Sequence, residues 1–158
     1  MVSDRPEDIL VTYGVGSCVV VGLYDPVAHV GGMLHALLPA ADTGGYDQGT
    51  PARFVDQGVP LLIEEIVQKG AWRSRLRAYL CGGARMFIDP GLIDLASIGD
   101  RNVRAAEQAL QAVQIGITAQ ATGGQLGRTI RLHIDTGRVS VKAIGQSEQV
   151  LNAEPRNR

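Results

Sequence analysis

Residues 11–26, VTYGVGSCVVVGLYDP, place two apolar runs rich in β-branched residues on either side of a glycine-containing turn. Short β-branched runs bounded by Gly and Pro are typical of strands, and a glycine inside such a run interrupts it. The segment therefore predicts two short strands, or one strand broken at Gly14 and Gly16, with the next turn at residues 25–26. Cys18 directly follows the glycine turn, which makes it either a buried thiol or a nucleophile at the open end of a strand.

Two segments carry the spacing of an amphipathic helix. In the first, VDQGVPLLIEEIVQKG, Pro60 fits best in a first turn, so we expect the helix to begin near Gly58 and to stop at Gly70. The second helix is expected to follow Asp100, a good N-cap. Its apolar residues recur at steps of three and four, at Val103, Ala106, Leu110 and Val113.

Further extended segments are GGMLHALLP, LRAYLC and ITAQAT, and TIRLHID turns at residues 136–137 into RVSVKAI to form a hairpin. Because strands outnumber helices and hairpin signals are frequent, the predicted fold class is α+β. We expect a single-domain layered α/β sandwich with a mixed, hairpin-rich sheet and two main helices. The domain is predicted at residues 1–145, and the polar residues 146–158 are expected to form a flexible C-terminal tail.

Composition argues against several classes of protein. The 158 residues carry a net charge of −1 with scattered basic residues, and only 4% are aromatic, so a nucleic-acid partner is not expected. No apolar stretch is long enough to span a bilayer, so membrane insertion is not expected either. The first residues lack the basic and apolar segments of a secretory signal. We therefore expect a cytoplasmic protein in which Cys18 and Cys81 are reduced thiols rather than a disulfide.

Cofactor and metal sites are not predicted. Gly14-x-Gly16 lacks the third glycine of a dinucleotide-binding turn and no helix follows it, and the chain has no phosphate-binding loop with a lysine. Ser17 does not stand in a G-x-S-x-G motif and is interpreted as a turn residue. The two cysteines and three histidines show no metal-ligand spacing.

Cysteine chemistry requires a base that helps to form the thiolate. His29 and His133 are expected to be exposed, and Cys81 is expected in the core. His35 differs because it lies in the next strand-like segment after Cys18. If the two segments pair as a hairpin, their strands lie about 4.8 Å apart and both residues reach the same open end of the sheet. The residues alone leave two interpretations open, a nucleophile with its base or a buried thiol beside a core imidazole.

Five blocks, GVGSCVVVGLYDP, GGMLHALLP, IGDRNV, GGQLGR and DTGRV, resemble the CheD family of chemoreceptor glutamine deamidases in order and spacing. The resemblance runs from about residue 11 to residue 144. It implies a layered α/β sandwich related to bacterial deamidating toxins, and a protein-glutamine glutaminase that uses no cofactor. It also implies Cys18 as nucleophile, His35 as base and Thr12 as the residue that orients the imidazole.

In this interpretation, backbone N–H groups around Gly16, Ser17 and Cys18 stabilise the oxyanion, residues 40–52 form a rim, and Arg128 steadies a glycine-bounded loop. The implied partners are the cytoplasmic helices of methyl-accepting chemotaxis receptors and, in many members, the phosphatase CheC. The alternative function is a non-catalytic adaptor that binds CheC or receptors and regulates CheY-phosphate dephosphorylation. A redox or metal protein is a third possibility, which predicts bound zinc or a disulfide between the two cysteines.

Overall fold

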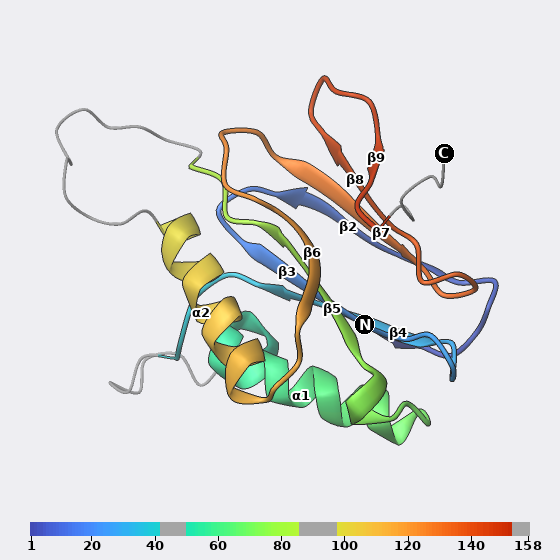
Figure 1. The fold of residues 1–158 in the computed structure, drawn as a ribbon. Helices are drawn as coiled ribbons and strands as arrows, with labels where there is room; N and C mark the ends of the chain where they lie inside the picture. The colour runs from blue at the N-terminus through green and yellow to red at the C-terminus, as the bar shows by residue number, and fades with distance from the viewer. Residues whose placement is uncertain (42–49, 86–97, 153–158) are drawn as a thin grey trace, which may run out of the picture.

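The computed structural model describes residues 1–41, 50–85 and 98–152, and it contains two β-sheets with two helices on the outer side of one of them (Figure 1). The five-stranded sheet has the order β1 (Val2–Ser3), β4 (Val30–Ala36), β3 (Val19–Asp25), β5 (Arg77–Gly82), β6 (Ile117–Thr122). The four-stranded sheet has the order β2 (Ile9–Val15), β7 (Arg128–His133), β8 (Val139–Ala143), β9 (Gln149–Val150). Among the strands that the structure describes, β5 and β6 are the one parallel pair, so the first sheet is mixed, and the predicted α+β sandwich is confirmed.

The strands predicted from residues 11–26 are both present, but they belong to different sheets. β2 pairs with β7, whereas β3 lies at the centre of the first sheet between β4 and β5. The turn at residues 16–18 therefore carries the chain from one sheet to the other. Gly14 has a φ of +65° beside an irregularity in the pairing of β2, a backbone conformation that glycine adopts without strain.

Every residue of β3 is buried because each of its faces lies against a different core. Val19, Val21 and Leu23 face the helices, while Val20 faces the second sheet together with Met33 of β4. Central strands that are covered on both faces lose the alternation between polar and apolar residues. This explains the unbroken apolar run after Cys18.

Helix α1 (Val55–Gln68) begins earlier than the sequence predicts, and the expected start near Gly58 is wrong. The backbone N–H groups of Val55 and Asp56 donate to the carbonyls of Leu38 and Pro39, so the segment after β4 satisfies donors that the first turn leaves free. Pro60 therefore lies inside the helix, where it removes one backbone hydrogen bond.

The predicted stop of α1 at Gly70 is confirmed. Gly70 has a φ of +102°, and its N–H donates to Val67 O while the N–H of Ala71 donates to Ile66 O. This pair of bonds is a Schellman motif. Two short 3₁₀ helices, η1 (Pro51–Arg53) and η2 (Arg73–Arg75), flank α1 along the chain.

Helix α2 (Ile98–Ala112) contains Asp100 in its first turn, so the prediction of Asp100 as the N-cap is wrong. Asp100 instead forms an ion pair with Arg85 at 2.7 Å. The predicted apolar face is confirmed at Ala106 and Leu110, which are buried against the first sheet. Neither helix combines the length and apolar character that crossing a membrane needs, as far as the described residues go.

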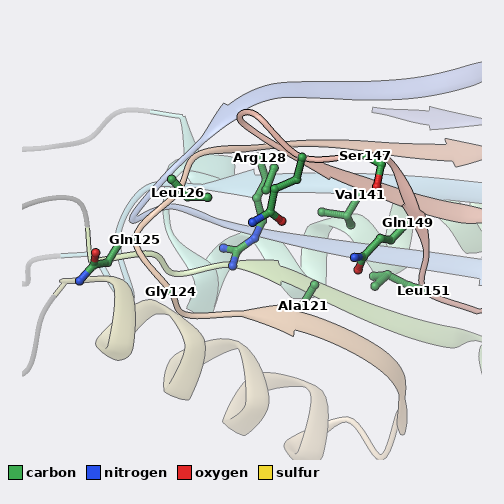
Figure 2. A pocket seen from close by; sticks show the side chains of 11 residues that line it. Ala121, Gly124, Gln125, Leu126, Arg128, Val141, Ser147, Gln149 and Leu151 are labelled. Atoms are coloured by element: carbon green, nitrogen blue, oxygen red, sulfur yellow. The ribbon is translucent and has the colours of Figure 1, made fainter.

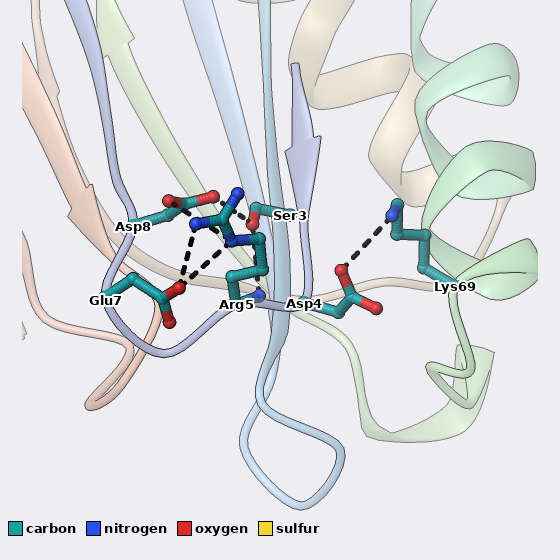
Figure 3. A network of polar contacts seen from close by, with 6 residues as sticks. All are labelled: Ser3, Asp4, Arg5, Glu7, Asp8 and Lys69. Atoms are coloured by element: carbon teal, nitrogen blue, oxygen red, sulfur yellow. Dashed lines mark hydrogen bonds and ion pairs between the residues drawn. The ribbon is translucent and has the colours of Figure 1, made fainter.

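Polar contacts at the N-terminus join β1 to β2 and to the end of α1 (Figure 3). The Ser3 hydroxyl donates to Asp8 at 2.6 Å, and Lys69 pairs with Asp4 at 3.2 Å. At the other end of the chain, residues 146–152 include β9, which pairs with β8, while residues 153–158 lie outside the described residues. The domain boundary at residues 145–146 stays a prediction.

Candidate active site

Cys18 ends the turn between β2 and β3, and its side chain is partly exposed at the margin of the core between the two sheets. Two backbone bonds hold this turn against the end of β5. The N–H of Gly83 donates to Cys18 O at 2.7 Å, and the N–H of Ala84 donates to Gly16 O at 2.8 Å. Gly82 is required there because its φ is +105° and a Cβ atom would lie 2.2 Å from Cys18 O.

His35 lies on the same face of the first sheet as the Cys18 thiol. It pairs directly with Val20, and the alternation of β4 turns it toward the second sheet, away from the helices that its neighbours Leu34 and Ala36 face. Cys18 precedes Val20 by two residues and packs against that same inter-sheet core. Residues in this diagonal relation across an antiparallel pair lie about 7–8 Å apart at their Cα atoms, within reach of long or aromatic side chains.

Thr12 is buried in β2, opposite Ile130 of β7. Ile130 belongs to the inter-sheet core. Thr12 of the second sheet therefore points into the same core as His35 of the first sheet. Thr12 Oγ1 and His35 Nε2 are both buried, and neither has a hydrogen-bond partner among the described residues. Buried polar atoms are rarely left unpaired in a merely structural position. Both atoms are thus available to each other or to a bound substrate.

Burial sets the protonation of the two candidate catalytic groups. It raises the pKa of the Cys18 thiol, and the backbone N–H of Cys18 itself partly offsets this by lowering that pKa. Burial lowers the pKa of His35, so its imidazole is neutral and able to accept a proton at pH 7. Without substrate, the site therefore holds a protonated thiol and a neutral imidazole on the same face of the first sheet.

The turn also presents free backbone donors. Among the described residues, the N–H groups of Gly16, Ser17 and Cys18 donate to no backbone carbonyl. The Cys18 N–H belongs to the same residue as the sulfur and lowers the pKa of its thiol. An oxyanion site requires donors of this kind near the carbon that the nucleophile attacks.

Comparison with known proteins identifies the family of this chain. The family model described as CheD chemotactic sensory transduction matches residues 37–143. A protein of Symbiobacterium thermophilum with the name probable chemoreceptor glutamine deamidase CheD is 44% identical over 150 residues, which cover 95% of this chain and 91% of the relative. A protein of the same name from Pyrococcus abyssi is 47% identical over 140 residues, 89% of this chain and 85% of the relative. This chain belongs to the CheD family. The resemblance stated from the five sequence blocks is therefore confirmed.

The CheD-family site contains one residue whose role sequence reasoning missed. Asn102 of α2 is fully buried, and its Nδ2 donates to Ser17 O at 3.0 Å and to Leu37 O at 2.9 Å. The block IGDRNV contributes to the resemblance, yet it gives Asn102 no role. The available signal was an amide on the buried face of an amphipathic helix, four residues before Ala106 and eight before Leu110.

Arg128 has the structural role expected for it. Its guanidinium donates to Gly123 O at 2.6 Å and to Gly82 O at 3.4 Å, so it steadies the glycine-rich loops behind the Cys18 turn. Figure 2 shows Arg128 among the side chains around a cavity of about 260 Å³ between β6 and the β8–β9 hairpin. Cys18 and His35 do not line this cavity.

The remaining cysteine and histidines differ in how far they are exposed. Cys81 is buried opposite Val20, and burial raises its pKa to about 12. Both cysteines are free thiols. His29 is exposed as predicted, whereas His133 is only half-exposed. Most of the expected rim at residues 40–52 lies outside the described residues, and the described part of the chain holds no group of three or more metal-ligating side chains.

Proposed function

We propose that this protein is a protein-glutamine deamidase that converts glutamine side chains on methyl-accepting chemotaxis receptors to glutamate. The proposal gives Cys18 the role of nucleophile, His35 that of general base and Thr12 that of the residue that orients the imidazole. The observation that carries it is the partly exposed thiol on the same sheet face as a neutral imidazole whose Nε2 has no hydrogen-bond partner among the described residues. The relatives named chemoreceptor glutamine deamidase supply the substrate class.

The reaction begins when His35 accepts the proton of the Cys18 thiol as the sulfur attacks the carboxamide carbon. The carbonyl oxygen becomes an oxyanion, which accepts hydrogen bonds from the N–H groups of Ser17 and Cys18, with Gly16 giving the turn its shape. Loss of one such donor typically slows a reaction about 100- to 1,000-fold. These donors need no rearrangement, because they have no other backbone partner among the described residues.

Collapse of this intermediate breaks the carbon–nitrogen bond, and protonated His35 gives its proton to the departing ammonia. A thioester to Cys18 remains. Water then attacks the thioester while His35 again accepts a proton, and the Cys18 thiol and a glutamate side chain are released. Thr12 acts through its hydroxyl, which holds the ring in one orientation through both proton transfers, in the manner of the third member of a triad.

Mass spectrometry of a receptor fragment incubated with the protein tests the proposal. Wild-type protein should produce the small mass gain of an amide converted to an acid at specific glutamines. Cys18→Ala and His35→Ala should abolish this gain, whereas Cys81→Ala, which removes the thiol outside the site, should retain it. Unchanged fragments with wild-type protein would reject the proposal. Receptor or CheC binding that survives in Cys18→Ala, without any deamidation by wild type, would favour the adaptor function.

A further inference from the structure

The carbonyl groups of the Cys18 turn all have partners on the side of β5 and α2. Gly16 O accepts from Ala84, Cys18 O accepts from Gly83, and Ser17 O accepts from Asn102 Nδ2. The first two come from backbone N–H groups and involve no side-chain donor. The third comes from a side chain, so it depends on the identity of residue 102.

A trans peptide unit points its C=O and N–H in opposite directions. Because Asn102 holds Ser17 O toward α2, the N–H of the same peptide unit, which belongs to Cys18, points away from α2. The second sheet, the Cys18 thiol and the His35 ring are on that opposite side. The bond from Asn102 therefore fixes the direction of the donor that lies beside the sulfur.

The same amide reaches the strand that carries the base. Its second bond goes to Leu37 O, two residues after His35, so one side chain links the Cys18 turn to the end of β4. Close backbone contact holds α2 in position for this link. A Cβ atom on Gly99 would lie 2.6 Å from Gly83 O, and Gly83 is the residue whose N–H holds Cys18 O. Figure 1 shows the start of α2 at the same end of the sheets as the turn between β2 and β3.

Core packing alone does not account for Asn102. The side chain is fully buried, and its Oδ1 has no hydrogen-bond partner among the described residues. An apolar residue would avoid the cost of desolvating that oxygen. The two hydrogen bonds from Nδ2 offset the free-energy cost of burying the amide.

We propose that Asn102 is a positioning residue of the deamidation site, which aims the Cys18 N–H at the oxyanion by holding the Ser17 carbonyl. This inference rests on the proposed function. It assigns Asn102 no contact with the substrate. Its loss should therefore slow the chemical steps without weakening substrate binding, and should change the reactivity of the free thiol far less than it changes kcat.

The test compares Asn102→Ala with wild type in steady-state deamidation of a receptor fragment. We expect kcat to fall about 100-fold or more, as for loss of an oxyanion donor, while KM changes less than about threefold. The rate at which iodoacetamide alkylates Cys18 should fall far less than kcat across pH 6–9, because that reaction forms no oxyanion. Ala106→Gly, which weakens the same helix without touching the turn, is the matched control and should keep the wild-type kcat.

Each outcome of this test either supports or overturns the positioning role of Asn102. If Asn102→Ala does not fold, Asn102→Leu, which keeps a side chain of similar size but has no donor, is held to the same criteria. Wild-type kcat in the folded variant, a fall in kcat matched by Ala106→Gly, or a parallel loss of Cys18 alkylation would overturn the role of Asn102 and leave the proposed function standing. Absence of deamidation by wild-type protein would overturn both.

Discussion

The two cysteines differ in their surroundings, and the difference predicts their reactivity. Cys18 is partly exposed at the margin of the inter-sheet core, and burial raises the pKa of its thiol. Cys81 is 1% exposed, and burial raises its pKa to about 12. Only thiolates react with alkylating reagents at useful rates. In the native protein, iodoacetamide should therefore label Cys18 alone.

The pH dependence of this labelling tests the protonation state of the site. Because the pKa of Cys18 lies above its ordinary value and that of His35 lies below, the labelling rate should climb continuously as the pH rises past about 8.5. Peptide mapping by mass spectrometry measures the labelling at each site, with Cys18→Ala as the blank. A plateau of fast labelling between about pH 5 and pH 7 would instead indicate a preformed thiolate–imidazolium pair, contrary to this prediction.

At the scale of elements, the Cys18 turn depends on how closely the end of β5 approaches it. Gly82 and Gly70 have nearly the same φ, +105° and +102°, but only Gly82 meets another atom when a Cβ is added. Gly70→Ala should therefore cost about 1–2 kcal/mol of folding free energy and leave deamidation intact. Gly82→Ala should cost more and also displace Cys18, reducing kcat by at least about tenfold.

Thermal unfolding and deamidation kinetics of the two variants separate the effect of backbone strain from the effect of displacing Cys18. Because the backbone strain is matched, a difference in activity reports the contact with Cys18 O. Equal activity of the two variants would mean that the turn tolerates movement, and the geometric basis of the site would have to be revised.

The elements also show what the sequence could predict. The apolar spacing in α2 is a local pattern, so its buried face at Ala106 and Leu110 was predicted correctly. The separation of β2 and β3 into different sheets depends on distant partners, which no local pattern reveals. The start of α1 was predicted wrongly because donors at its N-terminus bond to Leu38 and Pro39, outside the helix. Local propensity describes a helix only until a tertiary contact satisfies its ends.

In the candidate site too, local patterns were predictable and contacts between distant residues were not. Cys18 and His35 could be nominated because a hairpin brings consecutive strands together, and β3 and β4 do pair in this way. Thr12 came from the family resemblance alone. Asn102 bonds to Ser17, which lies 85 residues away in the sequence. The sequence gives no sign of such a bond except a polar residue on the buried face of a helix.

At the scale of the whole molecule, three layers place the candidate site where the helix-covered sheet meets the second sheet. The turn at residues 16–18 is one of the covalent links between those sheets, and Asn102 bonds it to the helical layer. The geometry of the site therefore depends on the registration of all three layers. At the opposite end of β3, Asp25 ends the same strand and fixes it to the segment between α1 and β5.

Asp25 is fully buried and accepts hydrogen bonds from Arg75 at 2.8 Å and from the backbone N–H groups of Trp72, Val27 and Ala28. Burial by itself raises the pKa of this carboxyl, but the bonds from Arg75 and the three N–H groups outweigh it and hold the pKa well below the usual range. In the unfolded chain an aspartate has a pKa of about 3.9. The contribution of Asp25 to stability is therefore complete at neutral pH and declines as the pH falls below about 5, where the unfolded chain begins to bind the proton.

Asp25→Asn should lower the free energy of unfolding by about 3 kcal/mol at pH 7, because it leaves Arg75 without its carboxylate. Urea unfolding of wild type and variant between pH 7 and pH 3 measures this difference at each pH. The difference between the two stabilities should narrow as the pH falls toward 3, because the unfolded wild-type chain then binds a proton that folded Asp25 binds only at a lower pH. Asp4→Asn, which breaks only the exposed pair with Lys69, should match the wild type throughout. Curves for Asp25→Asn that run parallel to the wild type down to pH 3 would show that the charge on Asp25 does not secure this end of β3.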